Sequence, residues 1–221
     1  RLWRQIPAGR VATYGDLADA LGDRIAARWV GHYAMHHAHD DECPCHRLVR
    51  ADGGLGSYVS GRVEDKRRRL RREGVASRGG LVKLADHRFT RFETDRPLVA
   101  LRRAQEAIVD RVSLRPLKKP ATLVAGVDVS YGVSGEGVAA YVLVEAASGD
   151  VLWKTTLRRP IRFPYITSFL SFRELPLLVD LLDEVDRQGR RADVVLVDGS
   201  GILHHRHAGI ATHLGVLRGQ S

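Results

Sequence analysis

The sequence predicts two domains, one α+β and one α/β, on the basis of three observations. The chain has 221 residues and 44% are hydrophobic, which is enough for two small cores. Two short helical patterns separated by a glycine occupy residues 15–35, as in a helix-turn-helix. After residue 98, Val-rich runs alternate with helical patterns, which is typical of an α/β layer fold. We place the domains at 1–78 and 98–221, with a linker at 79–97 where no periodicity is sustained.

The individual elements follow from spacing. In the first domain, helices are predicted at 15–21 and 26–35, with Gly22 at the turn. In the second, the predictions are a helix at 98–112, a buried strand at 122–131, a hairpin of 138–146 with 151–157, a helix at 171–185 and a second buried strand at 192–201. Each buried strand carries an acid, and the second ends in acid-glycine, which is common where a strand carries a site.

The composition favours a basic protein that binds a polyanion such as nucleic acid. Lys and Arg number 35 against 26 Asp and Glu, and the formal net charge of +9 is spread over both halves. A basic surface without a specific partner is the alternative explanation. The sequence has no apolar run long enough to span a membrane, and its start lacks a signal-peptide pattern. Cys43 and Cys45 are too close for an unstrained disulfide, so we expect a cytoplasmic protein with reduced thiols and no membrane partner.

The stretch HHAHDDECPCHR, residues 36–47, is compatible with two kinds of chemistry. Zinc sites usually space their cysteines two to four residues apart, whereas Pro44 alone separates these two, and we expect it to hinder both sulfurs from meeting on one ion. Adjacent His36 and His37 would also point about 100° apart on a helix. The alternative is a nucleophilic Cys45, because His46 follows it directly and can stabilise a thiolate. The residues alone leave both chemistries open.

Motifs in the first half resemble the C-terminal domain of the O6-alkylguanine-DNA alkyltransferases. They are IPAGRVATYGDLADALG, AARWVG and PCHRLVRADGGLGSY, followed by a tail from Lys66 to Glu73-Gly74, and they cover residues 1–76. The resemblance implies a winged helix-turn-helix-like domain that binds double-stranded DNA containing O6-alkylguanine. It also implies irreversible alkyl transfer to Cys45 without any cofactor. His46 would act as the base through a water molecule, and Glu73 would orient His46.

The same resemblance implies that the second helix enters the minor groove and that the target base is flipped out of the duplex. Arg28 would fill the space left by that base, Tyr14 would contact the target phosphate, and Tyr58 would lie in the loop over the pocket. Without the resemblance, the alternative interpretations are a core aromatic for Tyr14, a solvated helix charge for Arg28 and a helix-end acid for Glu73. His37 stands where the family has asparagine, and we expect slower transfer for that reason.

Three acids in the second half form another candidate site: Asp128 in GVDVSY, Glu174 in SFREL and Asp198 in VDGSGILHHR. A carboxylate on an apolar strand is costly unless it is paired or binds a cation. Three such acids indicate a hard divalent ion, Mg²⁺ or Mn²⁺, which can support phosphodiester cleavage. Acids that only cap helices or form ion pairs are the alternative.

The segments VAGVDVSY, RFPYITSFLSFRELP and ADVVLVDGSGILHHRHAGIATHLGV resemble endonuclease V, over residues 98–221. The resemblance implies an RNase H-like α/β fold that nicks DNA near deoxyinosine with Mg²⁺ or Mn²⁺. Asp128, Glu174 and Asp198 would be the catalytic metal ligands. The residues implied at the strand-separating wedge and near the flipped base are Tyr165, Gly199, Gly201, His204 and His213. The family continues beyond the last residues of this sequence, so we expect an incomplete nuclease domain.

These inferences together predict a monomeric DNA-repair fusion. The first domain would reverse O6-alkylguanine damage, and the second would recognise deoxyinosine and nick the strand. Two other classes of protein remain compatible with the sequence. One is a non-catalytic protein that binds damaged DNA, and the other is a metal-sensing helix-turn-helix regulator that uses the histidine-rich stretch.

Overall fold

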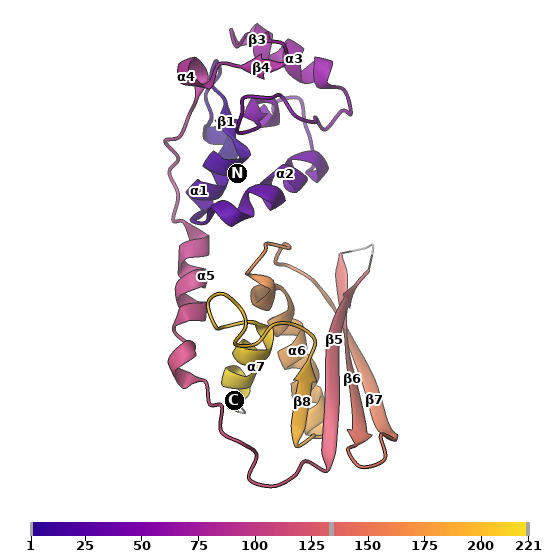
Figure 1. Cartoon of the computed structure of the whole chain (residues 1–221). Helices are drawn as coiled ribbons and strands as arrows, with labels where there is room; N and C mark the ends of the chain where they lie inside the picture. The colour runs from indigo at the N-terminus through magenta and orange to yellow at the C-terminus, as the bar shows by residue number, and fades with distance from the viewer. Residues whose placement is uncertain (1, 133–134, 220–221) are drawn as a thin grey trace. The chain divides into compact units, whose positions relative to one another are not determined.

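The computed structural model describes residues 2–132 and 135–219, which divide into two compact units (Figure 1). The first unit comprises Arg1–Ala100 and the second Leu101–Ser221. Each unit has its own hydrophobic core and is described by itself below. Within the described residues, no helix is both long and apolar enough to cross a membrane.

The first unit contains the predicted helix-turn-helix, formed by α1 (Tyr14–Leu21) and α2 (Ala27–His36). A capping box starts α1, because the Thr13 hydroxyl accepts from the Asp16 amide at 3.0 Å and the Asp16 carboxylate accepts from the Thr13 amide at 2.8 Å. Gly22 ends the helix in the left-handed conformation, with φ of 105°. The turn therefore lies where the glycine predicted it.

The other elements of the first unit are short. They are β1 (Ala12–Thr13), β2 (Leu48–Val49), α3 (Val63–Arg72), β3 (Ser77–Arg78), β4 (Leu81–Val82) and α4 (Leu84–His87). Strand β1 pairs in parallel with β2, and β3 pairs antiparallel with β4. A core of buried aliphatic side chains holds them together: Val11, Val49, Leu55, Leu70, Val75 and Val82. This core fixes the segment after α2 against the start of the chain.

The segment 79–97, expected to be a linker, is partly structured and belongs to the first unit. Its Val82 is 3% exposed, and the Val82 amide donates to the carbonyl of Gly53 at 2.9 Å. Arg88 pairs with Asp16 of α1 at 2.6 Å. These contacts join residues far apart in the sequence, which is why local periodicity did not reveal them.

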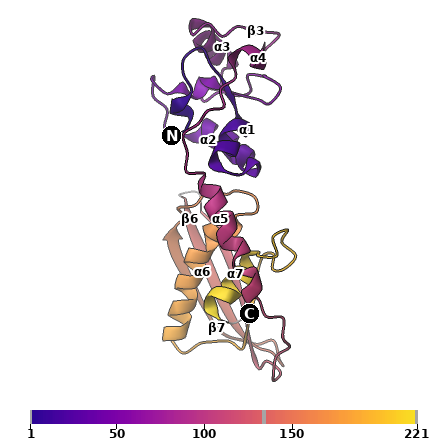
Figure 2. The same ribbon diagram turned by 90° about the vertical axis from the view of Figure 1, so that its left-hand side faces the viewer.

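The second unit is a four-stranded sheet covered on one face by helices (Figures 1 and 2). The strands are β5 (Leu123–Tyr131), β6 (Glu136–Glu145), β7 (Val151–Pro160) and β8 (Val194–Val197), in the order β7-β6-β5-β8. The helices are α5 (Pro97–Glu106), which begins before this unit, α6 (Leu170–Arg187) and α7 (Ile210–Arg218). Strand β5 runs antiparallel to β6 and parallel to β8. The predicted hairpin, helix and second strand are confirmed.

The sheet is buried on one face only, which corrects the expectation of fully buried strands. Along β5, Ala125, Val127 and Val129 are buried in the core with side chains of α6 and α7. The alternate positions Gly126 and Asp128 are exposed, because successive side chains of a strand point to opposite faces. Asp128 is therefore accessible rather than held in an apolar core.

Candidate active sites

The first candidate site surrounds Cys45, which lies in a 3-10 turn (Pro44–Arg47) between α2 and β2. Cys45 is only 3% exposed, and its Sγ lies 3.5 Å from Nδ1 of His39. Burial, reinforced by the neighbouring Cys43, raises the pKa of the Cys45 thiol to about 12. The guanidinium of Arg47, two residues after Cys45, is bound to Glu73 rather than to the thiol. The residues that follow Cys45 in the sequence therefore do not lower the pKa of its thiol into the neutral range.

His46 and Glu73 form the predicted pair beside Cys45. Nε2 of His46 lies 2.8 Å from Oε1 of Glu73, and Arg47 donates three hydrogen bonds to the same carboxylate, at 2.7, 2.9 and 3.1 Å. Burial alone would raise the pKa of Glu73, but the hydrogen bonds from Arg47 and His46 hold it below its usual value. Because ionised Glu73 accepts from Nε2, the lone pair of neutral His46 lies on Nδ1. That Nδ1 is buried without a hydrogen-bond partner.

The two tyrosines expected at this site lie near Cys45. Burial raises the pKa of Tyr14, and the charge of Cys45 adds to the shift. Tyr58 is 4% exposed, its pKa is raised to about 12 mainly by burial, and its ring packs edge-on against His39 at 5.9 Å. Arg28 is exposed on α2, as a residue that contacts DNA must be. The structure thus groups Tyr14 and Tyr58 with Cys45 and leaves Arg28 on the surface of the helix.

Lys66 is a further member of this site, although the sequence indicated only that it begins the motif that ends at Glu73-Gly74. It is 1% exposed on α3, and its Nζ donates to the carbonyl oxygen of Leu55. Burial lowers the pKa of Lys66 to about 8, and the charge of Cys45 opposes this shift. The available signal was its spacing four residues before Leu70, which puts both side chains on the buried face of α3.

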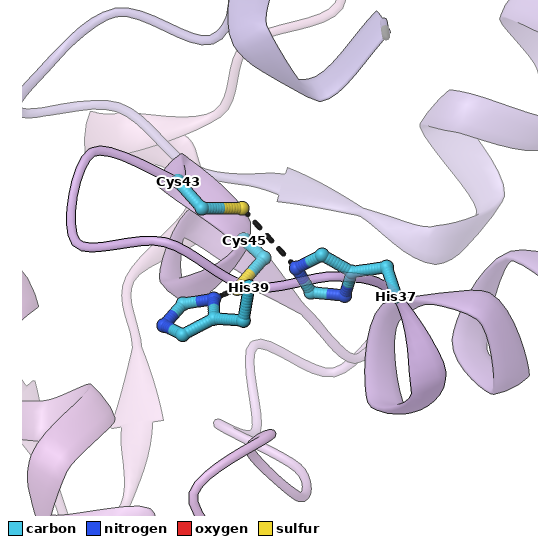
Figure 3. Close-up of side chains that lie close together, drawn as sticks. All are labelled: His37, His39, Cys43 and Cys45. Carbon is cyan, nitrogen blue, oxygen red and sulfur yellow. Dashed lines mark hydrogen bonds between the residues drawn. The ribbon is translucent and has the colours of Figure 1, made fainter.

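The histidine-rich stretch folds so that four potential metal ligands converge (Figure 3). The ligand atoms of His37, His39, Cys43 and Cys45 all lie within 4.8 Å of one another, and no other group of three or more His, Cys, Asp or Glu in residues 2–132 and 135–219 meets this criterion. The expectation that Pro44 would keep the sulfurs apart is wrong. Cys43 is extended and Pro44 begins the 3-10 turn, so the chain changes direction between the two cysteines.

The three acids of the second unit lie close enough together for the charges of Asp128 and Asp198 to act on Glu174. Asp128 follows Val127 in β5 and Asp198 follows Val197 in β8, and the two valines are register partners in the parallel pair. Glu174, on α6, is 7% exposed and accepts a hydrogen bond from the hydroxyl of Tyr131. Burial raises the pKa of Glu174, and the charges of Asp128 and Asp198 raise it further.

This carboxylate group fits a hard divalent cation. All its donor atoms are oxygens, and each acid disfavours the ionised form of Glu174, which a bound cation would relieve. The oxygens do not converge as closely as the ligands around Cys45 do, and Tyr131 occupies one oxygen of Glu174. Tyr131 leaves the second oxygen of Glu174 for an ion.

The other residues predicted in the second unit lie in its loops and in α7. Tyr165 is 61% exposed. Gly199 and Gly201 lie in the loop before α7, where a side chain at Gly199 would strike Ile210 at 2.4 Å. Nε2 of His204 and Nδ1 of His213 are buried without hydrogen-bond partners.

Comparison with known proteins identifies both units. The family model for the 6-O-methylguanine DNA methyltransferase DNA-binding domain matches residues 1–75, and that for Endonuclease V matches residues 106–221. The crystal structure of Endonuclease V from Ciona intestinalis, in complex with a DNA containing an inosine, is 28% identical over 57% of this chain and 56% of its own, with a TM-score of 0.52. The chain therefore joins an alkyltransferase domain to an endonuclease V domain.

Two relatives carry the same combination. The bifunctional methyltransferase/endonuclease of Picrophilus torridus is 35% identical over 96% of this chain and 67% of its own length. That of Thermoplasma volcanium is 38% identical over 97% of this chain and 64% of its own length. This chain belongs to the bifunctional methyltransferase/endonuclease family, which is a family of DNA-repair enzymes. It spans about two thirds of the length of these relatives, and the predicted fusion is confirmed.

Proposed function

We propose that the first unit repairs O6-alkylguanine in double-stranded DNA by moving the alkyl group to Cys45, and that the second unit nicks DNA near deoxyinosine. The observation that carries the first part is the pair His46–Glu73 beside a buried cysteine, with an unpartnered Nδ1 on His46. A base held in one tautomer by a carboxylate is the arrangement that activates a nucleophile.

The transfer reaction needs no bound cofactor. A water molecule between Nδ1 of His46 and the thiol of Cys45 relays the proton, and burial keeps the pKa of His46 below its usual value, so the ring is neutral and can accept it. The thiolate attacks the alkyl carbon, a sulfur–carbon bond forms, and the carbon–O6 bond breaks with its electron pair on guanine. Guanine then takes a proton from solvent. The thioether is stable, so each molecule acts once.

Access to Cys45 depends on the DNA complex. The thiol is covered by His39 and Tyr58, whereas a flipped base must reach within bonding distance of sulfur. His39 is exposed, so its ring can turn away without disturbing the core. Helix α2 would lie in the minor groove with Arg28 in the space of the flipped base, and Tyr14 would hold the target phosphate.

Labelled substrate tests the transfer. Duplex DNA carrying O6-methylguanine with a labelled methyl group should leave the label on the peptide containing Cys45, at one label per chain. Cys45→Ala should remove the label and keep DNA binding. Binding of damaged DNA without labelling by the wild-type chain would instead identify a non-catalytic damage-binding protein.

For the second unit, we propose that Asp128, Glu174 and Asp198 hold Mg²⁺ or Mn²⁺. The ion would supply an activated water and stabilise charge on the phosphodiester. Tyr165 would separate the strands, and the loop of Gly199 and Gly201 with His204 and His213 would surround the flipped hypoxanthine. The adjacency of Asp128 and Asp198 across β5 and β8 supports this assignment.

Nicking of an inosine-containing duplex tests the second unit. Cleavage should require Mg²⁺ or Mn²⁺ and should be lost in Asp198→Ala, while Asp180→Asn, an exposed acid on α6 paired with Arg159, serves as a control outside the site. Metal-dependent nicking that survives Asp198→Ala would remove this assignment.

A further inference from the structure

We propose that His37, His39, Cys43 and Cys45 bind one zinc ion, and that Cys45 is one of its two thiolate ligands. The proposal that zinc binds depends only on the geometry of the four side chains. Its effect on alkyl transfer rests on the function proposed above, because zinc binding and alkyl transfer use the same sulfur of Cys45.

The distances suit a tetrahedral ion. Zinc lies about 2.3 Å from sulfur and about 2.0–2.1 Å from nitrogen, so its ligand atoms lie roughly 3.3–3.8 Å from one another. Nε2 of His37 lies 3.2 Å from Sγ of Cys43, and Nδ1 of His39 lies 3.5 Å from Sγ of Cys45. All four atoms lie within 4.8 Å, so small side-chain rotations suffice to close the tetrahedron.

Nδ1 of His37, the ring nitrogen that would not bind the ion, already has the outer hydrogen-bond partner that is usual for a histidine ligand. Nδ1 of His37 lies 3.1 Å from the carbonyl oxygen of Ala34, and a carbonyl can only accept, so Nδ1 carries the hydrogen. The lone pair of the neutral ring then lies on Nε2, which faces Cys43. Histidine ligands of metals usually donate their other nitrogen to such an outer partner. The ring of His37 also packs against Trp3 at 4.7 Å, which limits its rotation.

The loop that carries the ligands is held from both sides. The Cys43 amide donates to the carbonyl of Asp40 at 3.1 Å. Asp41 pairs with Arg69 of α3 at 3.1 Å, and Asp40 lies 3.5 Å from Arg4. Asp40 and Asp41 are thus paired with arginines rather than directed into the cluster.

The donor set selects the ion. Two thiolates and two imidazoles are the ligands of tetrahedral zinc, whereas Mg²⁺ requires oxygen donors. Two thiolates also neutralise the charge of Zn²⁺, which matters because Cys43 and Cys45 are each 3% exposed. An open pocket of about 380 Å³ provides an entry path, since its lining includes two of the four ligands. The residues that line it are Trp3, Arg4, Tyr33, His37, Ala38 and Cys43.

Zinc binding changes how Cys45 becomes a nucleophile. A thiol that binds zinc gives its proton to solvent and remains a thiolate. The loaded site therefore needs no base for Cys45, and the relay through His46 serves the metal-free protein. His46 and Glu73 are not among the four ligands, so their hydrogen bond is compatible with a bound ion.

Metal titration of the whole chain tests the proposal. Metal-free protein should bind zinc in competition with a chromophoric chelator. Cobalt should give the intense visible bands of a tetrahedral ion together with thiolate-to-cobalt charge transfer in the near ultraviolet. The charge-transfer band reports sulfur ligands only, so an ion bound by the carboxylates of the second unit does not contribute to it.

Variants separate the ligands from their neighbours. His39→Ala removes an exposed ring and should leave the fold intact, and Cys43→Ser removes one sulfur. Each should weaken zinc binding by more than the roughly 10–100-fold that loss of an outer partner costs. His36→Ala is the matched control, because its Nδ1 faces the carbonyl of His32 at 2.7 Å outside the cluster. Zinc affinity unchanged by His39→Ala, or cobalt without a thiolate band, would overturn the site.

The metal titration and the label-transfer assay test the two proposals separately. Label on Cys45 in a chain that binds no zinc would remove this inference and leave the proposed function standing. Zinc binding without label transfer would remove the alkyltransferase function and keep the metal site, as in a metal-sensing regulator. Zinc-loaded His46→Ala should transfer label faster than the metal-free variant, and equal rates would show that the ion does not activate Cys45.

Discussion

His46 and Glu73 are 27 residues apart in the sequence, and their side chains meet at 2.8 Å. The contact with an ionised Glu73 places the hydrogen of a neutral His46 on Nε2, so Nδ1 would be the base in the transfer proposed above. Burial lowers the pKa of His46 even though Glu73 and its hydrogen bond raise it, so the ring is neutral at pH 7. A neutral ring with a free Nδ1 is what proton removal from the metal-free thiol requires.

Glu73→Gln should slow alkyl transfer without abolishing DNA binding. The amide can still contact His46, but it leaves the guanidinium of Arg47, 17% exposed, without a countercharge. We expect single-turnover transfer in metal-free protein to fall by about ten- to a thousandfold, since general bases contribute roughly 10²–10⁴-fold. Glu64→Gln, which loses only an exposed pair with Arg67 on the same helix, is the control. Wild-type rates in Glu73→Gln would contradict the relay.

Asp16→Asn should destabilise the first unit in a pH-dependent way. Burial would raise the pKa of Asp16, but hydrogen bonds from Arg88 and Thr13 lower it below the usual value. A lowered folded-state pKa adds stability that is present above the unfolded pKa of about 3.9 and lost as the pH falls through the folded value. We expect the free energy of unfolding to fall by about 2 kcal/mol at pH 7, a modest value because Arg88 is partly exposed. The difference from wild type should become smaller in acid. Denaturant titrations at several pH values measure it, and a pH-independent difference would argue against the ion pair.

Lys66→Met should reduce the reactivity of metal-free Cys45. The ammonium of Lys66 lowers the pKa of the thiol, although burial and Cys43 raise it more. Without that charge the thiolate becomes rarer, so alkylation by iodoacetamide should shift to higher pH. Lys83→Met, which removes an exposed lysine paired with Asp86, should leave the profile unchanged. A profile identical to wild type would place Lys66 in a purely structural role, as a donor to Leu55.

Glu174→Gln should abolish nicking and yet stabilise the metal-free second unit. Burial and the nearby charges raise the pKa of Glu174, so the folded state binds more protons than the unfolded state. Stability is then lost as the pH rises from about 4.3 through the raised value, and a neutral side chain escapes this loss. In the presence of a chelator the variant should melt higher at pH 7, and added Mg²⁺ should no longer stabilise it. Asp180→Asn, elsewhere on α6, is the control. A variant that melts lower with chelator would contradict the assignment.

Much of the fold followed from local sequence. Gly22 marked the turn of the helix-turn-helix because a left-handed residue must end α1. The Val-rich runs around Asp128 and Asp198 predicted β5 and β8, because β-branched residues favour strands. Apart from Lys66, the residues of both candidate sites lie in the motifs that resemble known families, and the fold brings these motifs together.

Other features depended on contacts that no local pattern contains. The segment expected to be a linker is ordered by the pairing of Val82 with the loop at Gly53 and of Arg88 with Asp16. The convergence of Cys43 and Cys45 depends on one change of backbone direction at Pro44, which the spacing alone suggested would separate them. The one-sided burial of the sheet depends on which helices pack against it.

The pairing of Val127 with Val197 has a consequence for how the second site could be lost. Because side chains alternate along a strand, sliding β8 by a single residue against β5 would send Asp198 to the opposite surface from Asp128. Insertion or deletion of one residue within either strand would therefore disable the proposed cleavage, even though every acidic side chain remained. Hydrogen bonding of the backbone, rather than the chemistry of the carboxylates, is what keeps these two charges together.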